Sequence, residues 1–141
     1  MQSIQKFVFI PLLFAFFWSC EGTPNESTEL PPPETIYEAA PDAEPGTGRL
    51  QVYVFKLVGK RYRPIRNAEV ALYLTFQDLE RKVPLDFGVT NQNGNINFGI
   101  LNVGNYYIET TLFEGNLAPR AKILVAQVQN GRSLTKNFSF D

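Results

Sequence analysis

The chain has 141 residues, with 13 Lys or Arg, 14 Asp or Glu and no histidine, and its formal net charge at pH 7 is −1. The lack of histidine excludes catalytic triads with a histidine base and metal sites built on imidazole. The near-zero charge is not that of a nucleic-acid-binding protein, and the single cysteine, Cys20, leaves no partner for an internal disulfide.

The N-terminal segment is apolar over twelve residues, Phe7–Trp18, and follows a lysine. This length is typical of the core of a secretory signal peptide, because a bilayer-spanning helix needs about 20 residues. The last two residues of the run are the aromatic Phe17 and Trp18, and Ser19 and Cys20 follow them. This ending resembles the lipobox of bacterial lipoproteins, although the family has an aliphatic and a small residue where the two aromatic residues stand. The resemblance implies a signal peptide over residues 1–19 and a lipid on Cys20; a plain secretory signal or an uncleaved anchor is the alternative.

The segment after the cysteine, Glu21–Thr47, is acidic and rich in proline. It holds seven acidic residues and six prolines, but no Lys or Arg. Such a composition cannot bury enough apolar surface to offset the entropy of ordering, so we predict a disordered or partly polyproline II spacer. Residues 20–47 would then separate a lipid anchor from a domain over residues 48–141.

The rest of the chain has the size of one domain and shows strand patterns separated by turn signals. No window of helical length shows a 3.6-residue period. Asn91–Asn95 contains an Asn-Gly pair and is predicted to be a hairpin turn, and Gly59–Arg63 is predicted to be a turn that ends at Pro64. This pattern of strands and turns predicts an all-β, seven-stranded sandwich. The predicted strands are Arg49–Val58, Ala68–Phe76, Leu85–Thr90, Ile96–Ile100, Asn105–Phe113, Ala121–Val128 and Ser133–Phe140.

A longer pattern of proline, small and aromatic residues runs through this domain. Its members are Pro64-Ile65, Asn67-Ala68-Glu69-Val70, Leu72, Thr90-Asn91, Gly94, Phe98, Leu101, Gly104 and Tyr106-Tyr107. The pattern resembles the prealbumin-like sandwich family that includes carboxypeptidase regulatory-like domains and collagen-adhesin B-type repeats. The resemblance implies an immunoglobulin-like or prealbumin-like sandwich and says little about function. Enzymes on this fold rely on histidines, so we expect a protein that is not an enzyme.

Some repeats of this family form a Lys–Asn isopeptide bond. Lys56 stands at the matching distance before Pro64 and shares the inward parity of its predicted strand. Glu109 and Asn137, which would be the acid and the amide, lie out of phase with the core residues of their strands. We therefore do not expect the crosslink.

Two surfaces are candidates for binding a partner. The strand Arg49–Val58 is apolar on both faces, which is unusual for a strand with one face in water. Its second face and two outward tyrosines of other strands would form an apolar partner surface. The residues of this surface are Tyr53, Phe55, Leu57, Tyr73 and Tyr107. Coverage of this face by the spacer or by the Gln77–Pro84 loop is the alternative.

The second candidate is a basic turn that comprises Lys60, Arg61, Arg63 and Arg66. Residues 48–141 hold twelve Lys or Arg against seven Asp or Glu, so the domain is positive while the spacer is negative. Anionic glycan or phospholipid would suit the turn; an ordinary solvated turn is the alternative.

These features predict a non-enzymatic, membrane-anchored lipoprotein of the bacterial cell envelope. We expect it at the outer membrane, as an interaction or accessory module, for instance a subunit of an outer-membrane assembly. The alternative is a carbohydrate-binding or adhesive surface module. The expected partners are the lipid bilayer through Cys20, an envelope protein and a glycan, but no nucleic acid. No cofactor beyond the covalent lipid on Cys20 and no metal site is expected.

Overall fold

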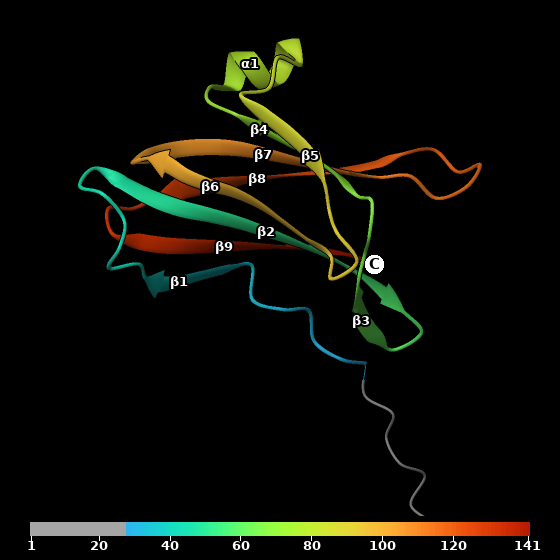
Figure 1. The fold of residues 1–141 in the computed structure, drawn as a ribbon. Coiled ribbons are helices and arrows are strands. Elements are labelled where there is room, and N and C mark those ends of the chain that lie inside the picture. Colours follow the sequence, from blue (N-terminus) through green and yellow to red (C-terminus); the bar gives the residue numbers. More distant parts are fainter. Residues whose placement is uncertain (1–27) are drawn as a thin grey trace, which may run out of the picture.

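The computed structural model describes residues 28–141 and shows two β-sheets packed face to face (Figure 1). The first sheet contains β1 (Thr35–Ala39), β2 (Thr47–Val58), β3 (Arg61–Pro64), β6 (Asn95–Asn102) and β9 (Arg132–Phe140). The second contains β4 (Glu69–Tyr73), β5 (Asp86–Val89), β7 (Gly104–Leu112) and β8 (Arg120–Val128). The described residues also include one short helix, α1 (Phe76–Arg81). The all-β prediction is confirmed, but the described strands number nine rather than seven.

Alternating apolar residues form the core between the two sheets. On β2, Leu50, Val52 and Val54 point inward and are fully buried, because side chains two apart lie on the same face of a strand. They pack in one cluster with inward residues of the second sheet and of β9. The fully buried core residues of those other strands include Val70, Leu72, Ile108, Ala126, Val128, Leu134 and Phe138.

The long strand β2 organises the first sheet. On one edge it pairs in parallel with β9, from Arg49 opposite Ser133 to Lys56 opposite Phe140. On the other edge it pairs antiparallel with β6 over its first half and with β3 over its last four residues. The Thr47 end of β2 therefore lies beside the β6–β7 turn, while its Val58 end forms the β2–β3 hairpin.

The Asn91–Asn95 stretch is a turn, but it does not join a hairpin. It connects β5 in the second sheet to β6 in the first, so the hairpin prediction is wrong. Gly94 has φ +73°, as expected for an Asn-Gly turn, and its carbonyl accepts a hydrogen bond from the Val54 amide. Local residues therefore specified the turn, whereas the pairing of its flanking strands depended on distant parts of the chain.

Two further elements depart from the sequence-based prediction. The predicted turn over Gly59–Arg63 contains the start of β3, a short strand paired with β2. The strand predicted to reach Phe76 ends at Tyr73, and α1 follows. Thr75 and Asp78 form a capping box at the start of this helix, each side chain accepting a hydrogen bond from the other residue's backbone amide. A Thr-x-x-Asp spacing is a known helix-start signal.

Part of the predicted spacer belongs to the sandwich. β1 pairs antiparallel with the outer edge of β9, and the predicted domain boundary at Gly48 lies inside β2 (Figure 1). Lys136 points inward and is only 5% exposed; its ammonium donates to Thr35 Oγ1 at 2.7 Å and to Glu34 Oε1 at 3.2 Å. A buried ammonium is costly without hydrogen-bond acceptors, and β1 with the residue before it supplies them to Lys136.

The segment before β1 is also attached to the sandwich. Asn137 points to the outer face of β9, yet it is only 6% exposed. Its side-chain amide donates to the Pro33 carbonyl at 2.6 Å, and its backbone amide donates to the Glu34 carbonyl at 2.8 Å. Asn137 therefore binds residues that were predicted to belong to the spacer. It does not face Lys56 or Glu109, the other two residues of the isopeptide pattern.

The one helix within residues 28–141 is too short and too polar to cross a bilayer. The predicted signal peptide and Cys20 lie outside the described residues.

Candidate functional site

The five residues of the predicted partner surface lie on two different faces of the molecule. Tyr53, Phe55 and Leu57 project from the outer face of β2 and are partly exposed. Tyr73 and Tyr107 project from the outer face of the second sheet, where they are paired opposite each other. The residues of each strand have the predicted outward parity, but the structure does not bring the two groups together.

Helix α1 covers Tyr73. This tyrosine is 3% exposed and packs with Ala71 and Leu79, and Tyr107 contacts the same cluster. The rings of Phe76 and Tyr107 meet edge to face at 5.8 Å. Coverage by the Gln77–Pro84 region, which was the alternative for this face, is therefore what the structure shows at Tyr73.

A polar triad lies beside this helix. Tyr73 donates its hydroxyl to Glu109 Oε2 at 3.0 Å, and Lys82 donates to both oxygens of the same carboxylate. Burial and then the bond to Glu109 raise the pKa of Tyr73 to about 12. The triad lines a groove of about 210 Å³ with the exposed Phe87 at its rim.

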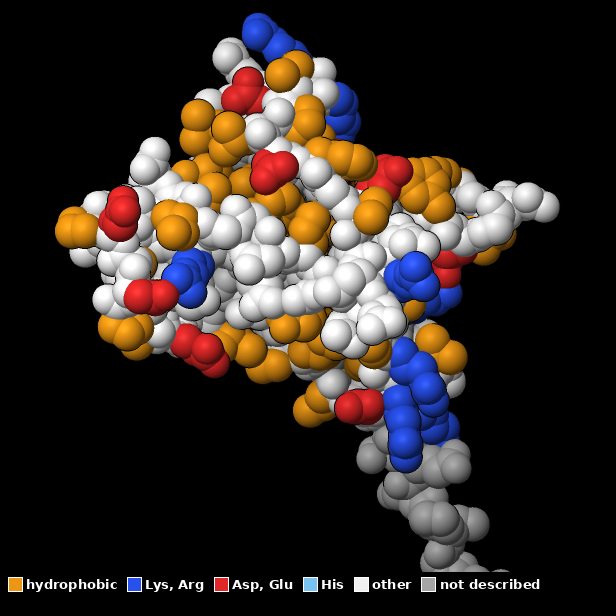
Figure 2. Space-filling model, viewed as in Figure 1, with side chains coloured by type: hydrophobic (Ala, Val, Ile, Leu, Met, Phe, Trp, Pro, Cys, Tyr) orange, Lys and Arg blue, Asp and Glu red, His pale blue; other side chains and the backbone are white. Residues whose placement is uncertain are grey.

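The basic turn lies on the β2–β3 hairpin. Arg61 stands opposite Val58 and Arg63 opposite Lys56, so both arginines share one face of this hairpin with Lys56. Lys60, Arg61, Arg63 and Arg66 are all exposed. In Figure 2, Lys and Arg side chains gather at the lower right, over this hairpin. The structure therefore brings the predicted basic residues to one end of the sandwich.

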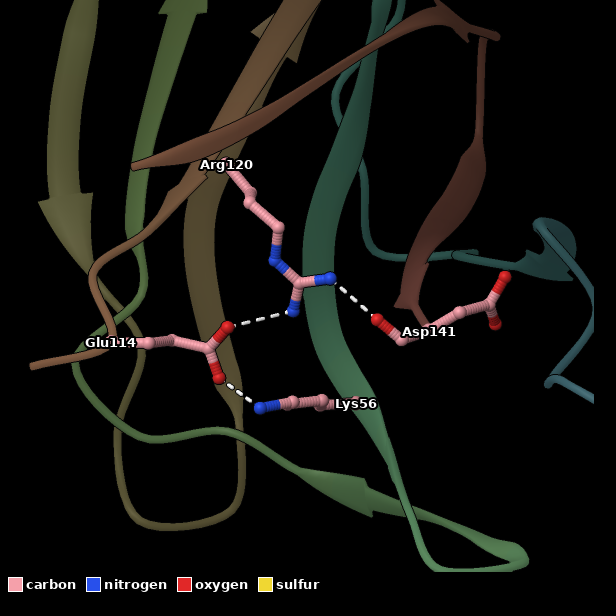
Figure 3. A network of polar contacts seen from close by, with 4 residues as sticks. All are labelled: Lys56, Glu114, Arg120 and Asp141. Atoms are coloured by element: carbon pink, nitrogen blue, oxygen red, sulfur yellow. Dashed lines mark hydrogen bonds and ion pairs between the residues drawn. The ribbon is translucent and has the colours of Figure 1, made fainter. Parts of the chain in front are cut away.

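An ion-pair network joins three elements at the same end (Figure 3). Lys56 on β2 donates to Glu114 Oε1, and Arg120 at the start of β8 donates to Glu114 Oε2 at 2.8 Å. Arg120 also donates to the Asp141 carbonyl and lies over the Phe140 ring, 5.7 Å from its centre. Strand parity predicts the inward direction of Lys56, but it gives no signal for Glu114, which lies after the end of β7.

A cleft opens between this network and the turn before β4. Its volume is about 400 Å³. Its lining combines charged and apolar side chains, among them Lys56, Arg66, Ile65, Phe113 and Glu114. The lining contains two cations, Lys56 and Arg66, and one carboxylate, Glu114, so the cleft is suited to anionic or hydroxyl-rich ligands.

The Glu114 carboxylate is expected to make the stability of the protein depend on pH. The hydrogen bond from Lys56 is the main cause that lowers the pKa of Glu114 below 4.5; partial burial opposes it, and the charges of Lys56 and Arg120 add to it. A carboxyl group whose pKa is lower in the folded than in the unfolded state stabilises the protein at a pH above its unfolded-state pKa. This contribution is lost as the pH falls through the folded-state pKa. We expect Glu114→Gln to lower the urea midpoint at pH 7, with the difference from wild type shrinking below about pH 4.5. A constant difference between pH 7 and pH 3 would contradict this account.

Within residues 28–141, no group of three or more Cys, Asp or Glu side chains is placed to hold a metal ion. Asp78 caps α1.

Comparisons with known proteins do not assign this chain to a family. No protein-family model matches the chain, and no curated protein matches it either. A crystal structure from Pseudomonas aeruginosa, described as a "putative carbohydrate binding protein", aligns over 70% of this chain and 92% of that one, with 14% identity and a TM-score of 0.47. Similarity this distant transfers no ligand. The fold and its charged end define a small β-sandwich protein, and the lipoprotein and prealbumin-like resemblances stay predictions.

Proposed function

We propose that this protein is a non-enzymatic, lipid-anchored module of the bacterial cell envelope, located at the outer membrane. The observation that carries this proposal is the position of Cys20, directly after a twelve-residue apolar run and a small residue. A lone cysteine in an exported chain has no disulfide partner, so lipidation gives its thiol a role. Stable anchoring requires two or more acyl chains, since one gives only marginal membrane binding.

The attachment of the segment before β2 to the sandwich supports an anchored module, because it shortens the chain between Cys20 and the domain. Thr35–Ala39 pair with β9, and Asn137 binds the carbonyls of Pro33 and Glu34. The chain between the anchor and the sandwich is thus much shorter than the predicted spacer. In this arrangement the sandwich presents its faces to other envelope proteins near the membrane surface.

Cys20→Ser tests the anchor. We expect the wild-type protein to be recovered with membranes and to incorporate radiolabelled palmitate, and the variant to lose both properties. Ser19→Ala is the matched control, because it keeps a small residue before the cysteine and should change neither result. Palmitate incorporation into the Cys20→Ser variant, or its full retention on membranes after a high-salt wash, would refute the proposal.

Glycan binding is the second candidate function, and the outer face of β2 favours it. The rings of Tyr53 and Phe55 are nearly parallel, at 11°, with centres 6.2 Å apart, and Gln51 donates to the Tyr53 hydroxyl. Asn95 and Asn97 lie opposite on β6. Partly exposed aromatic rings with amides beside them suit the apolar face and the hydroxyls of a sugar ring.

Replacing both Tyr53 and Phe55 with serine separates the two functions. Binding on a glycan array should fall to background if the face holds sugar, whereas loss of a crosslinked envelope protein would assign the face to a protein partner. The control is the pair Ile123→Ser and Val125→Ser, which removes two exposed apolar residues from the opposite sheet. If the Tyr53 and Phe55 variant changes neither glycan nor protein binding while it remains folded, this face is not the binding surface.

A further inference from the structure

The described chain begins next to the basic turn. The Glu29 amide donates to the Lys60 carbonyl at 2.6 Å, at the tip of the β2–β3 hairpin. Four residues later, the Pro33 carbonyl is held by Asn137. The segment that leads towards Cys20 therefore leaves the sandwich at the hairpin end of β2 and not at the Thr47 end.

Covalent geometry limits how far this end can lie from the anchor. Thr28 lies eight positions after Cys20, and an extended chain spans at most about 3.6 Å per position, or roughly 29 Å in total. Strand β2 has twelve residues, which correspond to roughly 40 Å at about 3.3 Å each. A lipid on Cys20 therefore keeps the hairpin near the bilayer, whereas the far end of β2 can stand clear of it.

The two ends of the sandwich differ in charge. The hairpin end carries the exposed residues Lys60, Arg61, Arg63 and Arg66. The opposite end carries the exposed residues Asp42 and Glu44 near the start of β2, together with Arg49, which pairs with Asp42, and the exposed Arg132 at the start of β9, so these four charges cancel. A sandwich polarised in this way turns its basic end towards an anionic surface.

We propose that the β2–β3 hairpin end rests on anionic phospholipid headgroups of the bilayer that holds Cys20, with the opposite end pointing away. This inference rests on the proposed lipid anchor, because the anchor selects the end that meets the membrane. Between Cys20 and Thr28 the sequence also contains Glu21 and Glu26, which are alternative anions for these arginines. Lipid phosphates surround the hairpin in excess, and each basic residue near an anionic bilayer strengthens binding by about fivefold.

Collisional quenching in reconstituted vesicles tests the orientation. The full lipidated protein carries one reporter fluorophore, on a cysteine that replaces either Val58 at the hairpin or Val103 at the opposite β6–β7 turn. Both valines are 50% exposed in the native structure, so they are matched reporter positions. Vesicles contain phosphatidylcholine alone or with phosphatidylglycerol, plus a lipid that carries a spin label on its headgroup.

We expect strong quenching at Val58→Cys and little at Val103→Cys in phosphatidylglycerol vesicles. The difference should fall in neutral vesicles and at 1 M salt, where the Debye length is about 3 Å. Combined Arg61→Gln and Arg63→Gln substitutions should weaken the contact about fivefold per arginine. The control substitutions Arg81→Gln and Arg132→Gln, at exposed arginines outside the hairpin, should leave it unchanged.

Two results would overturn the orientation. Equal quenching at both positions would show that neither end is preferred. Quenching at Val58→Cys that is the same in neutral and anionic vesicles would show that anionic headgroups do not hold the hairpin. A failed anchor is recognised separately, because the unlipidated Cys20 thiol of the wild-type protein would itself react with the fluorophore.

Discussion

Phe138→Ala is expected to lower the free energy of unfolding by about 3–5 kcal/mol. Phe138 is fully buried on β9, opposite Val54 of the parallel partner strand, and belongs to the cluster that fills the space between the sheets. Removal of the ring loses its transfer free energy and leaves a cavity that neighbouring strands cannot close, because backbone hydrogen bonds hold them in register. Urea unfolding followed by circular dichroism measures the change.

Phe113→Ala is the matched control for this substitution. Phe113 is 57% exposed in the β7–β8 connection, and we expect a change within about 0.5 kcal/mol. Equal destabilisation by the two substitutions would contradict the assignment of the core. A small effect at both positions would show that the sheets do not pack through Phe138.

Gly94→Ala is expected to destabilise the protein by about 2–5 kcal/mol. Two effects combine at this position. Gly94 has φ +73°, which an L-residue adopts at a cost of about 1–2 kcal/mol. A β-carbon there would also lie 2.8 Å from both the Val54 carbonyl oxygen and Pro64 Cβ, so backbone would have to move. Overpacking of this kind typically costs about 1–3 kcal/mol.

Gly59→Ala separates the two effects. Gly59 has φ +65° in the β2–β3 hairpin, but a β-carbon there meets nothing within 4 Å. We expect only the conformational cost of about 1–2 kcal/mol. If both variants have the same midpoint in urea, the close approach of Gly94 to β2 contributes nothing. A larger loss at Gly94 would show that this turn holds the chain where it crosses from one sheet to the other.

The alternation of apolar residues was enough to locate most of the sandwich. Each of the seven predicted strands overlaps a strand of the structure, and the inward parity of Leu50, Val52 and Val54 is correct. Parity also placed Tyr73 and Tyr107 on the outer side of their own strands. These features are local, because a strand's two faces follow from its side-chain period alone.

The elements that were missed have little local signal. β1 consists of exposed residues in a proline-rich, acidic segment, and its pairing depends on the buried Lys136 one hundred residues away. β3 is four residues long and contains two arginines. Of these three elements, only α1 has a recognisable local sequence signal, the Thr75–Asp78 capping box. A search for the 3.6-residue period of long helices overlooks it.

The same distinction applies to the candidate sites. The sequence by itself determined the basic turn, the aromatic face of β2 and the cysteine that would carry lipid. Only the tertiary structure decided that Glu29 meets Lys60 at the basic end, that Glu114 bridges Lys56 and Arg120, and that Tyr53 and Tyr73 face opposite ways. Side-chain period specifies the two faces of one strand, whereas the neighbours of each face depend on pairings such as that of β2 with β9, whose residues are distant in the chain.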